Sequence, residues 1–330
     1  MANGETFAIE ARGLAKRFDG VEAVAGIDFE VRSGELFGFL GPNGAGKTTT
    51  INMFTGLARP DSGSIALGGV DCTKNPRAAQ RLIGVVPDES NLYPELTGFE
   101  NLTFCASLYG MRKAERTARA SELLDAFGLT KAAGRKFGGY SKGMKRKLTI
   151  AAGIIHRPRI LFLDEPTTGI DVASARQVRQ LVAGLHAQGT TIFLTTHYIE
   201  EAERLCDRIA FLVNGRIRTI DTVANLVQPL REKHAAEIAC SPAPEEVRSS
   251  LSADFPEAAF TYPEDGKVRV ESAGSIRIGA LVRRLEERGV EVFEAKRLVP
   301  SLEDVFVRIT GIEAETMREG AGNNGGGKKP

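Results

Sequence analysis

The chain has 330 residues, and 43 Lys and Arg residues against 42 Asp and Glu residues give it a formal charge of +1. A length above roughly 250 residues predicts two domains, because single hydrophobic cores stop growing near that size. A near-neutral chain has no overall field that attracts polyanions, so we expect no nucleic-acid partner. We also expect a soluble chain, because no apolar run reaches the roughly 18 residues of a membrane helix and the first residues lack the apolar core of a signal peptide.

The first part of the chain predicts strands that lead into a glycine-rich loop. Short β-like runs occupy residues 6–14, 21–34 and 35–44, and a helix is expected over residues 48–57. Residues 98–156 have mostly helical patterns bounded by glycines and by Pro158, which predicts a helical insertion.

Strand patterns return after this insertion, at residues 159–166, 190–197 and 208–215. Between the first two, a helix is predicted over residues 172–187, with Asp171 as its N-cap. Strands that alternate with helices indicate a mainly parallel sheet, and therefore an α/β domain.

After about Asn225 the pattern changes to a β-α-β-β-α-β succession, which predicts a small ferredoxin-like α+β domain. The last 18 residues are rich in glycine and polar side chains that cannot build a core, so we expect them to be disordered. The predicted organisation is a first domain over residues 1–225, with its helical subdomain at about 98–156, a C-terminal domain over 232–312 and a disordered tail over 313–330.

The stretch GPNGAGKTT, residues 41–49, matches the pattern G-x-x-x-x-G-K-[ST] between a predicted strand and a helix. Glycines let backbone N–H groups turn toward phosphate oxygens, and the helix N-terminus adds partial positive charge. Lys47 is expected to reach the β and γ phosphates, and Thr48 to place its hydroxyl on Mg²⁺. The predicted phosphate-binding residues are Gly41, Pro42, Asn43, Gly44, Ala45, Gly46, Lys47, Thr48 and Thr49.

Two further strands end in residues suited to phosphate chemistry. The apolar strand predicted at ILFLDEP, residues 160–166, ends in the adjacent carboxylates of Asp164 and Glu165. If the alternation of a strand persists, the two side chains point to opposite faces and have different tasks. Asp164 fits the task of holding Mg²⁺, and Glu165 that of polarising an attacking water. His197 ends the strand TTIFLTTH, where its imidazole is expected to contact the γ phosphate or orient the water.

In combination, GPNGAGKTT, LFLDEP, TTGID and LTTH resemble the ATP-binding cassette ATPases of the ABC transporter superfamily, over residues from about 7 to 225. The resemblance implies a P-loop NTPase fold with a helical subdomain, and ATP and Mg²⁺ as cofactors. It also implies that Phe18 stacks on adenine, that Asp171 belongs to the D-loop, and that His197 is the switch histidine.

The stretch YSKGM, residues 140–144, stands where this family has its LSGGQ signature. Ser141 and Gly143 match that signature, whereas Tyr140, Lys142 and Met144 do not. The resemblance implies that Ser141 and Gly143 bind the ATP held by a second copy of the chain. The alternative is a basic docking surface. Helical geometry instead spreads three basic residues around the part of the helix outside its apolar face, where they make no single stripe: Lys145, Arg146 and Lys147. We expect the lysines mostly to solvate an exposed helix.

A second departure is Asp88, where the family usually has a glutamine that helps to bind Mg²⁺ and water. A carboxylate is a competent Mg²⁺ ligand. We therefore expect Asp88 to contribute to the nucleotide and metal site, with an altered metal dependence.

A single cassette followed by a domain that ends in PSLEDVFVRIT resembles the ATP-binding subunits of daunorubicin-resistance-like exporters. The resemblance implies that two copies close on ATP to drive separate permease subunits at the cytoplasmic face of the membrane. The alternative is a soluble ABC ATPase that acts on a ribosome or a nucleic-acid machine. Such relatives typically have two cassettes or a long coiled-coil insertion, and this sequence has neither. A regulatory ligand of the C-terminal domain is compatible with the exporter, and the cargo is not readable from the sequence.

Overall fold

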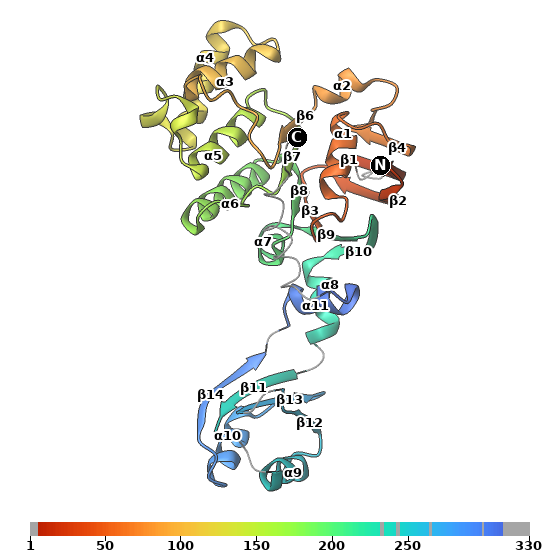
Figure 1. The fold of residues 1–330 in the computed structure, drawn as a ribbon, viewed down its shortest axis with the longest axis vertical. Helices are drawn as coiled ribbons and strands as arrows, with labels where there is room; N and C mark the ends of the chain where they lie inside the picture. Colours follow the sequence, from red (N-terminus) through yellow and green to blue (C-terminus); the bar gives the residue numbers. More distant parts are fainter. Residues whose placement is uncertain (1–5, 232–233, 242–244, 264–265, 299, 313–330) are drawn as a thin grey trace, which may run out of the picture. The chain divides into compact units, whose positions relative to one another are not determined.

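The computed structural model describes residues 6–231, 234–241, 245–263, 266–298 and 300–312 (Figure 1). The described residues fall into two compact units, one that ends at Val223 and is joined by the segment from Ile309, and one that covers Ala224–Arg308. The predicted boundaries at 225 and 232 lie close to this division and stay predictions. The tail predicted to be disordered lies outside the described residues.

The first unit contains an antiparallel sheet and a mainly parallel sheet. The antiparallel sheet has the order β2-β1-β4-β5, with the bounds β1 Phe7–Phe18, β2 Val21–Arg32, β4 Ser62–Leu67 and β5 Val70–Asp71. The second sheet has the order β10-β9-β3-β8-β7-β6, and all its described pairs except β10 with β9 are parallel, as predicted. Its strands are β3 Leu36–Leu40, β6 Ile83–Val86, β7 Ile160–Asp164, β8 Thr191–Thr196, β9 Arg208–Val213 and β10 Arg216–Thr222.

Four neighbouring parallel strands of this second sheet end at one edge. The P-loop, residues 41–49, follows β3; His197 follows β8; Glu165 follows β7; and Asp88 lies just beyond β6. In open α/β sheets, ligands bind outside the carboxyl ends of the strands. The strand order therefore brings together four segments that are far apart in the sequence.

Buried phenylalanines hold the P-loop helix against this sheet. Phe54 of α1 (Lys47–Thr55) stacks on Phe162 of β7 with ring centroids 5.5 Å apart, and its ring meets the edge of Phe193 of β8 at 5.6 Å. Each such pair contributes about 1 kcal/mol beyond the area that it buries. The packing fixes the helix that carries the P-loop relative to the strand that carries Asp164.

The predicted helical insertion is confirmed as a group of three helices that pack together (Figure 1). These helices are α3 Gly98–Leu108, α4 Lys113–Ala126 and α5 Lys142–Gly153, with short 3₁₀ turns at Thr130–Ala132 and Phe137–Gly139. The other helices of the first unit are α2 Pro76–Gln80, α6 Val172–Ala187 and α7 Ile199–Leu205. Among the described helices, none combines the length and apolar character that crossing a membrane requires.

The second unit contains an antiparallel sheet of order β12-β13-β11-β14. Its core includes Ile238, Leu251, Val270 and Leu285. The predicted β-α-β-β-α-β succession is present, whereas the ferredoxin-like assignment stays a prediction. The bounds are β11 His234–Cys240, α9 Glu245–Asp254, β12 Ala258–Thr261, β13 Lys267–Ser272, α10 Ile278–Glu286 and β14 Val292–Leu298, flanked by α8 Val223–Arg231 and α11 Leu302–Thr310.

Candidate nucleotide site

The P-loop curls around the ammonium group of its own lysine. The Lys47 side chain is 5% exposed, and its Nζ donates hydrogen bonds to the carbonyl oxygens of Gly41 at 2.7 Å and Pro42 at 3.1 Å. Gly46 has a φ of 106°, and a Cβ atom there would lie 2.3 Å from the carbonyl oxygen of Ala23, so only glycine fits at this position. The loop therefore presents backbone and one cation at the N-terminus of α1, an arrangement that suits phosphate.

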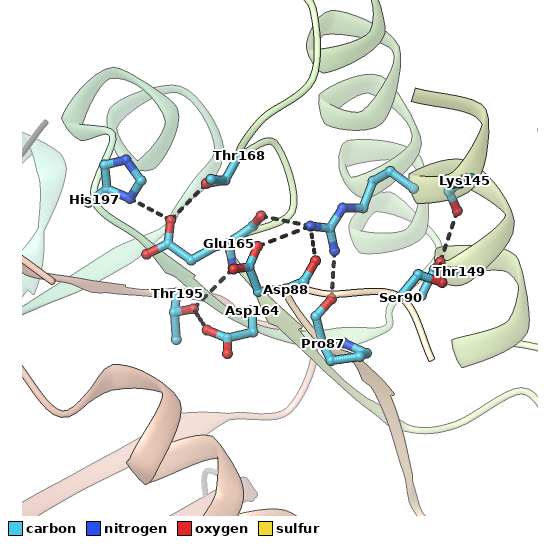
Figure 2. Close-up of polar contacts among 11 residues, drawn as sticks. Pro87, Asp88, Ser90, Lys145, Thr149, Asp164, Glu165, Thr168, Thr195 and His197 are labelled. Carbon is cyan, nitrogen blue, oxygen red and sulfur yellow. Dashed lines mark hydrogen bonds and ion pairs between the residues drawn. The ribbon is translucent and has the colours of Figure 1, made fainter. Parts of the chain in front are cut away.

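Glu165 lies at the centre of the polar contacts at this edge of the sheet (Figure 2). Its Oε2 atom is 2.6 Å from Nδ1 of His197 and accepts a hydrogen bond from the Thr168 hydroxyl at 3.0 Å. Its Oε1 atom is 3.2 Å from Nζ of Lys47. Burial raises the pKa of Glu165, but the hydrogen bond with His197 and the nearby Lys47 ammonium outweigh burial and hold the pKa below its usual value. The carboxylate is therefore charged at neutral pH, as a residue that polarises water must be.

Asp164 has a different environment from its neighbour in the sequence. Its carboxylate accepts a hydrogen bond from the hydroxyl of Thr195 on the adjacent strand (Figure 2). The two carboxylates have different partners, as expected, but strand alternation is not the cause. β7 ends at Asp164, and Glu165 has a φ of 48°, in the left-handed region. The end of the strand, not its period, gives the two carboxylates different partners.

The residues predicted to hold Mg²⁺ supply oxygen atoms, which are the ligands that this ion prefers. Thr48 exposes its side chain at the start of α1, and Asp164 and Asp88 supply carboxylates. Mg²⁺ in nucleotide sites takes one or two carboxylates together with waters and phosphate oxygens. The described residues contain no cluster of three His, Cys, Asp or Glu that could hold a metal by itself, and such a site does not need one.

His197 is buried, with 3% of its surface exposed. Its Nδ1 contacts Glu165, whereas its Nε2 has no hydrogen-bond partner among the described residues. Buried polar atoms usually have a partner. The imidazole thus has one nitrogen available for a further polar group at this site.

Phe18, the predicted adenine-stacking residue, is 48% exposed at the end of β1. The ammonium of Lys16 lies 5.1 Å from its ring centroid. Ala23, which abuts Gly46 of the P-loop, belongs to β2, the strand that pairs with β1. The exposed ring therefore lies on the hairpin next to the P-loop.

The predicted signature residues lie at the start of α5. Ser141 is exposed, and its hydroxyl caps the helix by accepting a hydrogen bond from the backbone N–H of Met144 at 3.3 Å. Gly143 is buried, and a Cβ atom there would lie 2.2 Å from Oγ and 2.6 Å from Cβ of Ser174 on α6. Close packing between α5 and α6 therefore requires glycine at position 143.

We expect Gly143→Ala to weaken ATP-dependent dimerisation, because the new methyl group displaces the start of α5 from α6. Removing the opposing side chain in Gly143→Ala/Ser174→Gly is expected to recover part of the dimer. Size-exclusion chromatography with ATP measures both effects. Equal losses in the single and the double variant would contradict the packing explanation.

Asp171, the predicted D-loop residue, is exposed and caps α6 as the sequence predicts. Its carboxylate accepts hydrogen bonds from the backbone N–H of Ser174 at 2.9 Å and from the Ser174 hydroxyl at 2.7 Å, which lower the pKa of Asp171. Among the hydrogen bonds and ion pairs of the described residues, none joins Ser141 or Asp171 to the P-loop of the same chain.

Arg146 is a site residue that the sequence analysis missed. The expectation that it lies outside the buried face of the helix is wrong, because Arg146 is 7% exposed and donates hydrogen bonds to the carbonyl oxygens of Pro87, Asp88 and Glu165. In the structure Arg146 lies on a stripe of buried residues at helical spacing, but no local sequence signal separates this arginine from its basic neighbours. That stripe consists of Gly143, Arg146, Ile150 and Gly153.

Asp88 lies beside this guanidinium. Its side chain is 51% exposed, and its Oδ1 atom is 3.4 Å from Nη2 of Arg146. Burial raises the pKa of Asp88, the charge of Arg146 opposes that rise, and the carboxylates of Glu165 and Asp164 add to it. The partner of Asp88 in the structure is thus a cation on α5.

Glu201 of α7 is a second buried carboxyl that the sequence analysis missed. It is 3% exposed, and neither oxygen makes a well-formed hydrogen bond within the described residues, although the hydroxyls of Thr196 and Thr167 are nearby. Burial raises the pKa of Glu201, and the two hydroxyls and Arg179 only partly oppose it.

A carboxyl with a raised pKa predicts a pH-dependent stability. Above the ordinary pKa of 4.5, the folded chain binds more protons at Glu201 than the unfolded chain does, so the free energy of unfolding falls as pH rises through the raised pKa. We expect Glu201→Gln to have a larger stabilising, or smaller destabilising, effect on Tm at pH 8 than at pH 5.5. The exposed Glu200→Gln is the control, and the same Tm difference at both pH values would contradict the prediction.

Comparisons with known proteins agree with this geometry. The family model described as ABC transporter matches residues 24–168. The chain is 39% identical over 316 residues to the daunorubicin resistance ATP-binding protein DrrA2 of Streptomyces coeruleorubidus, and this alignment covers 94% of the chain and 97% of the relative. It is 37% identical over 320 residues to the Nod factor export ATP-binding protein I of Burkholderia orbicola, which covers 93% and 98%.

Solved structures give the same result for the fold. The structure of an ATP binding subunit of an ABC transporter is 31% identical, with a TM-score of 0.62, and covers 68% of this chain and 93% of that one. The dimeric structure of MJ0796, a bacterial ABC transporter cassette, is 26% identical, with a TM-score of 0.61, and covers 65% and 98%. The predicted P-loop NTPase cassette is confirmed, and the chain belongs to the ATP-binding, ATP-hydrolysing subunits of ABC transporters, close to the daunorubicin-resistance type.

Proposed function

We propose that this chain is the ATPase subunit of an exporter, and that two copies close on ATP to drive separate permease subunits. The names of its relatives support export, since they describe resistance to daunorubicin and linearmycin and export of Nod factor. Two relatives align over almost the whole chain, including the C-terminal unit. A ribosome-associated or DNA-associated ATPase is not favoured by any of these names.

The proposed chemistry is in-line attack of water on the γ phosphate of ATP. Glu165 polarises the water, because its carboxylate is held charged between His197 and Lys47. His197 contacts the γ phosphate through Nε2, the nitrogen without a partner within the described residues. This cluster of Glu165, His197 and Lys47 is the observation that carries the assignment.

The remaining residues of the proposed site bind and orient the nucleotide. The P-loop from Gly41 to Thr49 cradles the phosphates, and Phe18 stacks on adenine. Ser141, Gly143 and Asp171 meet the ATP of the second copy, which agrees with the exposed positions of Ser141 and Asp171 at the N-termini of α5 and α6.

Thr48, Asp164 and Asp88 are proposed to hold Mg²⁺ through their oxygen atoms. When bound, the ion neutralises charge that develops on the phosphate oxygens. The carboxylate of Asp164 is prepared for this task, because the Thr195 hydroxyl fixes its orientation.

The proposed contact with a permease has a suitable surface on the helical group. Tyr93 and Phe104 are exposed and meet edge to face at 5.3 Å, and Leu108 and Tyr109 are exposed on and just after the same helix, α3. Exposed apolar side chains that gather in this way indicate a protein partner. Tyr93 lies on the segment that follows Asp88, so the partner would contact the same loop as Arg146 does.

Co-purification tests the exporter assignment. We expect the tagged chain, solubilised gently from membranes of its own cell, to bring down a polytopic protein that has no cassette of its own. We also propose that the chain is a peripheral subunit at the cytoplasmic face, which its protection from protease added to intact cells would test. Recovery of ribosomes or DNA-bound factors instead would overturn the transport assignment and leave the ATPase assignment in place.

A further inference from the structure

We propose that Arg146 is a positioning residue for ATP hydrolysis, and that it ties the segment after β6 to the backbone of Glu165. The inference rests on the proposed role of Glu165. It extends that proposal by naming the residue that links the signature helix α5, the loop at Asp88 and the carboxylate that polarises water. Arg146 itself touches neither nucleotide nor water in this scheme and acts through Glu165.

The guanidinium group joins two segments that are far apart in the sequence. Nη1 donates to the carbonyl oxygen of Pro87 at 2.6 Å. Nη2 donates to the carbonyl oxygen of Asp88 at 2.6 Å and to that of Glu165 at 3.3 Å. The planar fork of an arginine can contact several acceptors at fixed angles, whereas a lysine presents one point charge. The contacts therefore depend on the shape of the side chain as well as on its charge.

The charge of Arg146 is only partly compensated at this position. Burial lowers the pKa of the guanidinium, and the carboxylates of Asp88, Asp164 and Glu165 partly oppose that shift. Of these three, only Asp88 forms an ion pair with Arg146 within the described residues. Because a buried charge is costly without a partner, Asp88 and Arg146 form one unit. A neutral residue at position 88 would leave the cation with weaker compensation.

The strained backbone of Glu165 makes the position of this residue depend on hydrogen bonds to its peptide groups. A non-glycine residue with a φ of 48° is strained and persists only where its surroundings hold it. Its N–H donates to the carbonyl oxygen of Thr195 at 3.1 Å, and its carbonyl oxygen accepts hydrogen bonds from the N–H of Thr168 at 3.2 Å and from Arg146. Loss of the guanidinium removes one of the contacts that hold this peptide.

Arg146 lies on the same helix as the predicted signature residues, so its contacts connect that helix with the backbone of Glu165. Ser141 and Gly143 occupy the start of the same helix, which packs on α6 through Gly143. A second copy that moves α5, or a partner that moves residues 87–88, would therefore also displace the backbone of Glu165. Arg146 is the side chain that transmits both movements.

The test compares four forms of the full-length chain in steady-state ATP hydrolysis and in equilibrium ATP binding. We expect Arg146→Met to lower kcat by about tenfold or more, since small displacements of a reacting group cost up to about a hundredfold in rate. The Kd for ATP is expected to change less than about threefold, because Arg146 does not touch the nucleotide. Arg146→Lys should recover only part of kcat. Lys147→Met is the matched control, because Lys147 is the next residue of α5 and its ammonium donates a hydrogen bond to the side chain of Gln177 at 3.2 Å, away from residues 87, 88 and 165.

A double-mutant cycle tests the pairing with Asp88. The cycle is measured at saturating Mg²⁺, because asparagine keeps an oxygen atom that can face the metal and the metal role of Asp88 is then not limiting. Under that condition we expect Asp88→Asn to lower kcat, and Asp88→Asn/Arg146→Met to lower it no further than Arg146→Met does alone, because coupled residues are not additive. Independent, additive losses would overturn the pairing. Thermal unfolding of each variant identifies loss of folding, and if Arg146→Met does not fold, Asp88→Asn and Arg146→Lys, which retain most contacts, decide the question through kcat.

Glu165→Gln in the same assay separates this inference from the proposed function. Turnover that persists in Glu165→Gln would overturn the role of Glu165 and with it the link. Loss of ATP hydrolysis in Glu165→Gln together with an unchanged kcat in Arg146→Met would overturn the role of Arg146 and leave the role of Glu165 in place. A loss in Lys147→Met as large as in Arg146→Met would show a general effect of charge on α5 and would also overturn it.

Discussion

Glu165→Gln is expected to reduce ATP hydrolysis by at least about a hundredfold, because a general base contributes about 10² to 10⁴ in rate and an amide cannot act as one. Glutamine keeps the size of the side chain, and ATP binding should remain. The variant should therefore accumulate with ATP as a closed dimer. Phosphate release measures the first effect, and size-exclusion chromatography with ATP measures the second.

A second substitution tests whether that dimer is the proposed nucleotide sandwich. Adding Ser141→Arg to Glu165→Gln is expected to abolish the dimer, because a bulky cation replaces the hydroxyl at the exposed N-terminus of α5. Glu200 is an exposed carboxylate on α7, so Glu200→Gln controls for the loss of one negative charge in Glu165→Gln. A dimer that survives Ser141→Arg would contradict the assignment of YSKGM as the signature.

Lys47→Ala is expected to weaken ATP binding by about 10- to 100-fold, since a hydrogen bond to a charged group contributes about 1.5 to 3 kcal/mol. The ammonium lies inside the P-loop, where it contacts two carbonyl oxygens and Glu165. Its loss removes the cation that the triphosphate needs. Titration with a fluorescent ATP analogue measures the affinity.

Lys74→Ala is a matched control for this substitution, because Lys74 is an exposed lysine of the same unit. Thermal unfolding of both variants is informative, since removal of Lys47 leaves the buried Glu165 with His197 and Thr168 as its side-chain partners. ATP affinity in Lys47→Ala equal to that of Lys74→Ala would contradict the proposed role of the P-loop lysine.

Local sequence was sufficient for the elements that carry the phosphate-binding motif. The apolar run LFGFL is the buried strand β3, and the glycine-rich loop after it leads into α1 as predicted. The helix predicted over residues 172–187 begins and ends at those residues, and Asp171 caps it. These features depend on residues that are neighbours in the chain, because caps, turns and strand periods are local interactions.

Local sequence failed where the burial of a polar residue depends on another segment. Arg146 and Lys147 are adjacent and both basic, yet only Arg146 is buried. The carbonyl oxygens that receive its hydrogen bonds come from residues 87, 88 and 165, and no local pattern of α5 reports on them. Glu201 was missed for the same reason, since α7 offers many charged residues and only packing decides which is enclosed.

The sequence by itself determined the chemistry of this protein: a phosphate-binding loop, two carboxylates and a histidine at the ends of strands, in an order typical of an ABC ATPase. The tertiary structure decided how these groups are connected. Parallel pairing of β3, β8, β7 and β6 places the groups at one edge, and helix packing inserts Arg146 between two of the segments. The reason is physical, because motifs are written in adjacent residues, whereas the orientation and charge state of a buried side chain are set by atoms that only folding brings near.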